Sequence, residues 1–396
     1  MRFDLPDCPS AFQDIKVTCV VGFRHVSRRR KQIGKNARKD VHGREAVEKV
    51  VRVYTDAGLD GIGFGNIGAA EAAPLVGMTL AEVWPGLADA TSPLGRADHA
   101  LFDLAGKAMG KPAWAVMGGA GPEWVPVYDT TLYFSDLLPE FAHLGVGRLI
   151  AELDEGLREG HRSFKVKVGR GARWMEPEAG LRRDIEVVRA LGDHGGSGIR
   201  LMADANDQFG VDTARRFLDA VGDRLVFAEE MFPENVADCT ALREWIRARG
   251  LPTLVADGES ECDPAVHERL ARAGALDVLQ PDIRALGLAL QVSLSRAIAD
   301  LPAVRIATHN WGSYLGTYKM LQLGRAIPNF MIAEFDRSDS DLFDDSHWPL
   351  EDGRMRVPDA PGCGLRPRED VFRARYLPQA WLVGEAGVPA NWRTRR

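Results

Sequence analysis

Short apolar segments alternate with longer amphipathic ones through the second half of the chain. Eight segments after Pro122 are rich in aliphatic and aromatic residues, as buried strands are: 125–133, 163–169, 199–206, 225–231, 253–260, 276–282, 305–310 and 330–336. Between them, residues 176–192, 211–222 and 265–275 have the composition of helices. Eight such β-α units favour a (β/α)8 barrel over a doubly wound sheet, which usually has fewer strands.

The first third of the chain has a mixed pattern. Residues 15–22 are apolar and β-branched and predict a strand, and residues 97–110 predict an amphipathic helix that ends at Gly110. Residues 44–57 carry apolar side chains at a helical period and predict a helix closed by Gly58. The glycine-rich segment 59–68 is expected to be a turn. The tail, residues 366–396, has no regular pattern and is expected to pack against the first third.

Composition narrows the class of protein. The 396 residues include 56 acidic and 50 basic side chains, and the net charge of −6 argues against a nucleic-acid-binding protein. Five scattered cysteines without a C-x-x-C pair exclude a disulfide framework and a thiolate zinc site. No signal-peptide pattern and no long apolar run is present, so we expect a soluble, cytoplasmic protein without a membrane partner.

One segment departs from the acidic average. Residues 24–39 contain eight basic side chains and no acidic one. With Gly34 and Asn36 inside it, the segment is expected to be turn-like. A solvated loop accounts for most of these charges.

The predicted barrel strands end in titratable side chains. These are Lys165, Lys167, Asp204, Glu229, Glu259, Asp282, His309 and Glu334. They follow one another at intervals of about one β-α unit. Because active-site groups of barrels lie at the carboxyl ends of strands, we expect these side chains to meet at one mouth.

The chemistry of these side chains indicates a metal site between two bases. Three converging carboxylates repel one another unless a cation neutralises them, and an oxygen-only ligand set suits Mg²⁺. Lys165 and Lys167 are two residues apart on one strand, so both point into the barrel. A neighbouring cation would lower the pKa of one of them and allow it to act as a base. Asp282 and His309 lie on adjacent strands and can form a dyad in which the carboxylate orients the imidazole.

In this order, the motifs K-x-K, D-x-N, E-E, G-E-S, Asp and His resemble those of the mandelate racemase-like subgroup of the enolase superfamily. ALFDLAGKAMGKPAWAVMGG (100–119) is similar to the helix and turn that lead into the barrel of that family. The resemblance implies an α+β capping domain (1–124), a modified barrel (125–365) and a C-terminal segment (366–396) that completes the cap. It also implies one Mg²⁺, abstraction of the proton α to a carboxylate, an enediolate intermediate and a homo-oligomer.

The resemblance assigns roles to single residues. Asp204, Glu229 and Glu259 correspond to the metal ligands, Lys167 to one base, and His309 with Asp282 to the other. Lys165 would polarise the substrate carboxylate and Glu334 would hydrogen-bond it. The usual E-E-P reads Glu229-Glu230-Met231 here, so Glu230 stays an alternative ligand, and Asp257, two residues before Glu259, could compete as well.

Bases on both faces of a substrate allow two reactions. A dehydratase would remove the α proton and lose the β-hydroxyl, and a racemase or epimerase of a 2-hydroxy acid would exchange the proton between Lys167 and His309. The basic segment favours a polar acid, so we expect a dehydratase of a sugar acid, an aldonate or aldarate. The dyad would be unnecessary for cycloisomerisation, and a non-catalytic binding protein is a remote alternative.

Substrate specificity is expected to reside in the loops near residues 22–43 and 61–68. Arg24, His25 and one or two of residues 28–31 are candidates to bind the far end of an anionic substrate. Asn206 and Trp311 are further candidate contacts, with packing as the alternative for Trp311. The segment GIGFGNIG (61–68) lacks the surroundings of a dinucleotide site and is expected to form a flap over the pocket.

Overall fold

The computed structural model describes residues 8, 10–84 and 97–384, and its larger part is a barrel of parallel strands. The strands are β4 (Trp124–Leu132), β5 (Ser163–Lys167), β6 (Arg200–Asp204), β7 (Leu225–Glu229), β8 (Leu254–Asp257), β9 (Val278–Leu279), β10 (Arg305–Ile306) and β11 (Ala333–Phe335). Consecutive strands from β4 to β10 pair in parallel, and β11 pairs with β4. A bridge between Ile306 and Phe330 joins β10 to the segment before β11 and closes the barrel. The (β/α)8 prediction is confirmed, with all eight strands where the pattern placed them.

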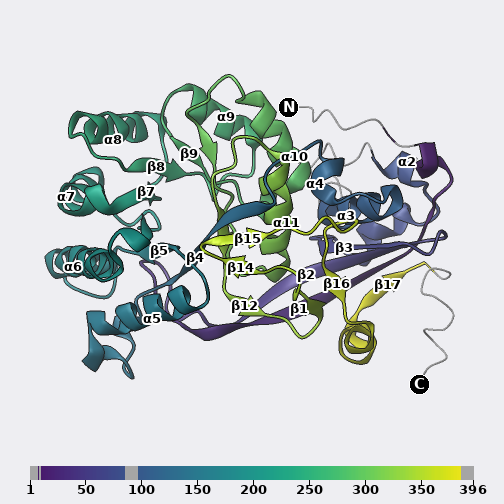
Figure 1. The fold of residues 1–396 in the computed structure, drawn as a ribbon, viewed down its shortest axis with the longest axis horizontal. Coiled ribbons are helices and arrows are strands. Elements are labelled where there is room, and N and C mark those ends of the chain that lie inside the picture. Colours follow the sequence, from purple (N-terminus) through teal and green to yellow (C-terminus); the bar gives the residue numbers. More distant parts are fainter. Residues whose placement is uncertain (1–7, 9, 85–96, 385–396) are drawn as a thin grey trace.

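Helices surround these strands. They are α5 (Val146–Arg158), α6 (Pro177–Gly195), α7 (Val211–Val221), α8 (Val236–Ala248), α9 (Pro264–Arg272), α10 (Ile283–Ala297) and α11 (Tyr314–Ala326). Figure 1 shows α5 to α8 as an outer layer along one flank of the barrel. A separate apolar cluster fills the barrel interior: Tyr128, Met202, Phe227, Ala256, Val278, Ala307 and Ile332. Because these apolar side chains fill the interior, polar side chains are found at the strand ends.

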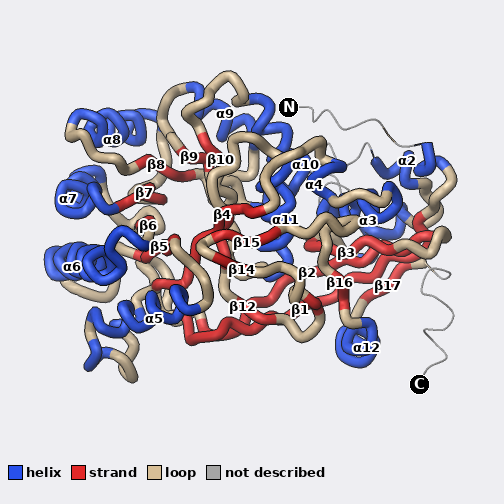
Figure 2. Tube along the Cα trace, in the orientation of Figure 1, coloured by secondary structure: helices blue, strands red, loops and turns tan. Residues whose placement is uncertain are grey.

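A second, antiparallel sheet lies beside the barrel. Its strands β1 (Val17–Ile33), β2 (Gly43–Thr55) and β3 (Asp60–Phe64) pair in sequence order. Both β12 (Ser338–Asp339) and β17 (Trp381–Val383) pair with β1, so segments that follow the barrel complete the sheet. Figure 2 shows the long strands β1 and β2 running from this sheet to the barrel. Helix α3 (Asp98–Met109), predicted from the sequence, packs on β3 and ends at Gly110 with φ 64°.

Shorter elements complete the described part. The helices are α1 (Ala69–Ala72), α2 (Leu80–Val83), α4 (Ala113–Val116) and α12 (Glu369–Val371), and the strands are β13 (Phe343–Asp344), β14 (Leu350–Glu351), β15 (Arg354–Arg356) and β16 (Arg366–Pro367). Within the described residues, no helix has the length and apolar character needed to cross a bilayer.

Three predictions for the first third are wrong, and the first two concern residues 44–57 and the basic segment. Residues 44–57 form strand β2 rather than a helix, because exposed residues 45, 47 and 49 alternate with buried residues 46, 48 and 50. The basic segment is also extended up to residue 33, as part of β1, and its even-numbered residues 24–30 are exposed while the odd-numbered ones are buried. Residues 44–57 include five β-branched side chains, which favour a strand over a helix, whereas the basic segment has only Val26 and Ile33 and is held in the strand by its pairing with β2.

The predicted glycine-rich turn is also a strand. Residues 60–64 form β3, and their glycines allow α3 to approach closely. A Cβ on Gly61 would lie 2.1 Å from the carbonyl oxygen of Ala100, and one on Gly63 would lie 2.6 Å from Cβ of His99. This part of the expected flap is therefore a packed sheet strand.

Candidate active site

Three carboxylates converge at the carboxyl ends of β6, β7 and β8. Asp204 ends β6, Glu230 follows β7 and Glu259 follows β8, and oxygens of the three lie within 4.8 Å of one another. Asp204 and Glu230 are buried. Glu230 has φ 43°, a conformation that few non-glycine residues adopt and that is often found at functional sites.

The trio differs from the sequence prediction at one position. Glu229 points into the barrel, where Oε1 lies 2.5 Å from Nζ of Lys165 and Oε2 accepts a hydrogen bond of 2.7 Å from Nε2 of Gln280. Glu230 takes its place among the three carboxylates. Successive strand residues point to opposite faces, so Glu230 would face the helices if β7 continued, and its positive φ ends the strand and re-aims the side chain. Asp257 lies in a neighbouring group with Asp207 and Glu230.

The trio fits a hard divalent cation. Burial, together with the charges of Glu259 and Asp204, raises the pKa of Glu230 to about 9. Oε1 of Glu230 is buried and has no hydrogen-bond partner among the described residues, whereas Oε2 accepts a bond of 3.0 Å from Nδ2 of Asn206. A buried carboxylate oxygen without a partner is costly unless it binds a cation.

Two buried lysines of β5 lie beside the carboxylates. Lys167 forms an ion pair with Asp204, its neighbour in the parallel register. Nζ of Lys165 lies 2.8 Å from Glu334 and 3.4 Å from Asp204, in addition to its pair with Glu229. Burial lowers the pKa of Lys165, but Glu229 and Glu334 more than offset this effect and raise it well above its usual value. These carboxylates therefore favour the charged form of Lys165. Burial likewise lowers the pKa of Lys167, but Asp204 outweighs burial and raises that pKa in the same direction.

A histidine dyad lies on the opposite side of the trio. His309 donates from Nδ1 to Oδ2 of Asp282 at 2.8 Å, and its Nε2 lies 3.2 Å from Oε2 of Glu259. Burial lowers the pKa of His309, but the charges of Glu259 and Glu334 and the contact with Asp282 outweigh it and raise the pKa to about 10. Glu334 accepts hydrogen bonds from Oγ1 of Thr130 and from the backbone N–H of Asn310.

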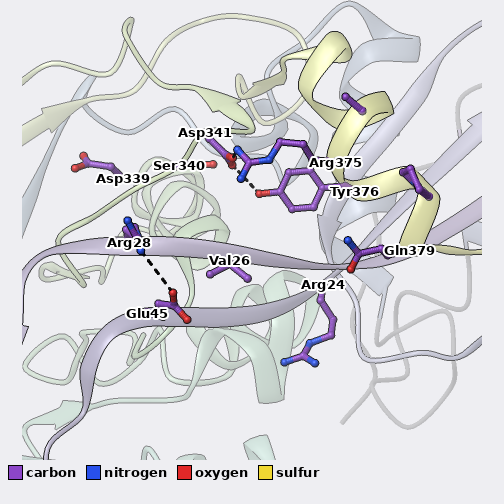
Figure 3. Close-up of a pocket in the computed structure, with 12 residues that line it drawn as sticks. Arg24, Val26, Arg28, Glu45, Asp339, Ser340, Asp341, Arg375, Tyr376 and Gln379 are labelled. Atoms are coloured by element: carbon purple, nitrogen blue, oxygen red, sulfur yellow. Dashed lines mark hydrogen bonds and ion pairs between the residues drawn. The ribbon is translucent and has the colours of Figure 1, made fainter. Parts of the chain in front are cut away.

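Among the predicted substrate contacts, Asn206 and Trp311 lie at this mouth and two others do not. Trp311 stacks on Tyr133 with ring centroids 4.9 Å apart. His25 is fully buried and bonded through both ring nitrogens, to Glu48 at 2.9 Å and Ser340 at 2.8 Å, so it is a satisfied core histidine. Arg24 lines a groove of about 930 Å³ on the outer face of β1 (Figure 3).

The basic segment is largely neutralised by acidic side chains. The pairs are Arg28–Glu45, Arg29–Asp336, Arg30–Asp339, Lys31–Glu152, Lys35–Asp40 and Arg38–Asp207. The expectation that residues 28–31 bind an anionic substrate is therefore not supported by their contacts. Arg29 instead lies under Trp311, with its guanidinium carbon 4.3 Å from the ring centroid.

Three residues at the mouth were not predicted from the sequence. Gln280 lies two residues before Asp282, and the strand period could have pointed to it. The sequence pattern predicts Tyr133 only as a strand residue, whereas in the structure its ring centroid lies 5.3 Å from Nζ of Lys167. His42 lies in the loop after β1 and contacts Tyr133 and Trp311. No local sequence pattern predicts these contacts.

Comparison with known proteins agrees with this geometry. The family model described as Enolase C-terminal domain-like matches residues 148–371. The chain belongs to the mandelate racemase-like subgroup of the enolase superfamily. It is 30% identical to D-galactarolactone cycloisomerase of Agrobacterium fabrum over 294 residues, 71% of this chain and 73% of that one. It is 26% identical to D-xylonate dehydratase of Haloferax volcanii, over 85% of this chain and 87% of that one.

A solved enolase-superfamily structure extends the likeness to nearly the whole chain. An E234A mutant of galacturonate dehydratase from Geobacillus sp., crystallised with Mg, superimposes with a TM-score of 0.88 at 29% identity and covers 97% of this chain and 100% of its own. These three relatives are thus one cycloisomerase and two dehydratases, each named for a sugar acid or its lactone.

Proposed function

We propose that this enolase-superfamily protein is a Mg²⁺-dependent dehydratase of a sugar acid, an aldonate or aldarate, that forms a 2-keto-3-deoxy acid. One observation carries the proposal: Lys167 contacts Asp204 while Nε2 of His309 lies 3.2 Å from Glu259, so a potential base and acid flank the same carboxylate trio. The dehydratases among its relatives support this choice.

Asp204, Glu230 and Glu259 would hold the Mg²⁺. When bound, the ion would neutralise the charge that develops on the substrate carboxylate as the α proton leaves. Lys165, a cation beside Glu334, would hold the same carboxylate through an ion pair. In the role that the family resemblance implies, Glu334 would have to carry a proton in order to donate a hydrogen bond to that carboxylate.

The remaining side chains move the protons. Lys167 would take the proton from the α carbon, and the electron pair of the broken C–H bond would first move onto the substrate carboxylate. That pair would then form a double bond between the α and β carbons as the C–O bond at the β carbon breaks. His309 would donate its Nε2 proton to the departing β-hydroxyl, which leaves as water. The resulting enol takes up a proton at the β carbon and loses the proton of its α-hydroxyl oxygen, which gives the 2-keto-3-deoxy acid. Asp282 keeps the imidazole oriented through Nδ1.

Incubation with Mg²⁺ and a panel of aldonic and aldaric acids tests this proposal. We expect a 2-keto-3-deoxy product from at least one acid. Absence of such a product from the whole panel, together with racemisation of a 2-hydroxy acid, would support the racemase alternative instead. A lactone substrate or product would show a cycloisomerase, the activity of the Agrobacterium relative.

Solvent exchange separates an enzyme from a non-catalytic binding protein. We expect deuterium from the solvent at the α carbon of recovered substrate, and loss of this exchange in Lys167→Ala. Salt-dependent nucleic-acid binding without exchange would overturn an enzymatic role. A cytoplasmic location and a homo-oligomer stay predictions, which fractionation and light scattering would check.

A further inference from the structure

An aromatic wall closes one side of the active-site mouth. It consists of His42, Tyr133 and Trp311. The ring centroid of His42 lies 5.0 Å from that of Tyr133 and 5.5 Å from that of Trp311. Because Tyr133 also lies 5.3 Å from Nζ of Lys167, and Trp311 follows the dyad histidine by two residues, the wall adjoins the reacting groups.

The loop of residues 34–42, which carries His42, is held against the barrel. The backbone N–H of Phe134 donates to the carbonyl of Lys35 at 2.8 Å, and Nε1 of Trp174 donates to the carbonyl of Asn36 at 2.7 Å. Arg38 forms an ion pair with Asp207, which directly follows the mouth's Asp204-x-Asn206 motif. The wall therefore has a defined position over the strand ends.

Two cations close to the wall, Arg29 and Lys35, already have acidic partners. Arg29, stacked on Trp311, donates two hydrogen bonds of 2.8 Å to the carboxylate of Asp336. Lys35 lies 3.4 Å from Asp40, with its Nζ 4.2 Å from the centroid of the Trp174 ring. Of the loop's described basic residues, Lys39 alone has no ion pair, and it is exposed to solvent. A second substrate carboxylate against this wall would lose its hydration without gaining a buried counter-charge.

His42 is suited to an uncharged hydroxyl. Burial, with the nearby charges of Lys167 and Arg29, lowers its pKa to about 4, so the ring is neutral at pH 7. Its Nε2 is buried and makes no hydrogen bond to any described residue. A neutral imidazole nitrogen can exchange a hydrogen bond with a hydroxyl, and flat aromatic rings pack against the C–H faces of a polyol chain.

We propose that His42, Tyr133 and Trp311 form a subsite for the uncharged, hydroxylated end of a sugar acid with a single carboxylate. His42 is the residue that determines this specificity, by hydrogen-bonding a hydroxyl far from the reacting carbon. The substrate is thus an aldonate or uronate rather than an aldarate. This inference rests on the proposed function as a sugar-acid dehydratase.

Sets of acids with one configuration test the subsite. In the galacto set (D-galactonate and galactarate) and the gluco set (D-gluconate and D-glucarate), the configuration at C2 to C5 is the same and only the far end changes, from an uncharged alcohol to a carboxylate. We expect a monocarboxylate of the accepted set to have a kcat/KM at least tenfold higher than its aldarate. An aldarate that equals or exceeds the monocarboxylates would overturn the inference, and loss of that aldarate activity in Lys39→Ala would assign the second carboxylate to Lys39.

Variants of His42 give a second readout. We expect His42→Phe to raise KM for the monocarboxylate at least tenfold with kcat changed less than threefold, and His42→Asn to recover part of the affinity. His194→Phe, at an exposed histidine of α6, is the matched control and should change neither constant. An unchanged KM in His42→Phe would contradict the inference.

Equilibrium binding separates this inference from the dehydratase proposal. If no acid of either set yields a 2-keto-3-deoxy product, the dehydratase proposal fails. Isothermal titration of D-galactonate and galactarate into the Mg²⁺-loaded protein then still tests the subsite, because tighter binding of galactonate that is lost in His42→Phe supports it and tighter binding of galactarate refutes it.

Discussion

Nδ1 of His309 lies 2.8 Å from Oδ2 of Asp282, and the two residues come from neighbouring strands of the barrel. The contact leaves the other ring nitrogen, Nε2, directed at the carboxylate trio. It also favours the protonated imidazole, which is the form that can donate a proton to a leaving hydroxyl. The pair is thus a ready general acid.

Asp282→Asn should lower kcat for dehydration about 100-fold and leave KM within a few-fold, because an amide neither stabilises the imidazolium nor enforces its tautomer. Steady-state kinetics of 2-keto-3-deoxy product formation would measure the effect. Asp300→Asn, which breaks an exposed ion pair with Arg272 on the barrel exterior, is the control. A full kcat in Asp282→Asn would remove the dyad from the mechanism.

Asp204→Asn should abolish activity together with its dependence on Mg²⁺. Asp204 belongs to the trio and also pairs with Lys167, so its loss removes a ligand and frees a lysine at once. Turnover measured across a Mg²⁺ titration is the check. Retained Mg²⁺-dependent turnover would refute the ligand assignment.

The two consecutive glutamates should differ in their effect on the metal. Glu230→Gln should weaken Mg²⁺ binding at least tenfold, because Glu230 is a member of the trio with an unpartnered oxygen. Glu229→Gln should weaken it less and act mainly on the buried pair with Lys165. Calorimetric titration with Mg²⁺ ranks the two variants, and the reverse order would restore Glu229 as the ligand.

A buried histidine away from the mouth should make the fold sensitive to acid. His161 is fully buried near Phe164 and Phe335, and neither ring nitrogen has a hydrogen-bond partner in the described structure. Burial lowers its pKa from 6.5 to about 4. Between these values the unfolded chain binds a proton that the folded chain does not, so stability is present above pH 6.5 and is lost as the pH falls towards 4.

His161→Leu should remove that loss. Between pH 7 and pH 4.5 we expect the wild-type free energy of unfolding to fall by about 2 kcal/mol more than that of the variant. Urea denaturation at both pH values measures the difference. Parallel curves for the two proteins would show that His161 does not couple the fold to pH.

The barrel could be predicted from the sequence because its signal is local and repeated. After the first barrel strand, each buried strand is a short apolar run that ends in a titratable side chain, as with Asp204 on β6, and amphipathic segments lie between the strands. The capping sheet could not be predicted in the same way. The valines of residues 44–57 satisfy a helical period as well as a strand period, and only pairing with β1 and β3 selects the strand.

Residue types and their order along the chain therefore specified the barrel, the carboxylates, the two lysines and the histidine dyad, since parallel strands bring their carboxyl ends together whatever the loops do. Tertiary structure decided the rest. A positive φ turns Glu230 rather than Glu229 towards Asp204 and Glu259. Long-range contacts bury His25 among satisfied partners and place His42 against Trp311. These outcomes depend on packing between distant segments, which no local pattern encodes.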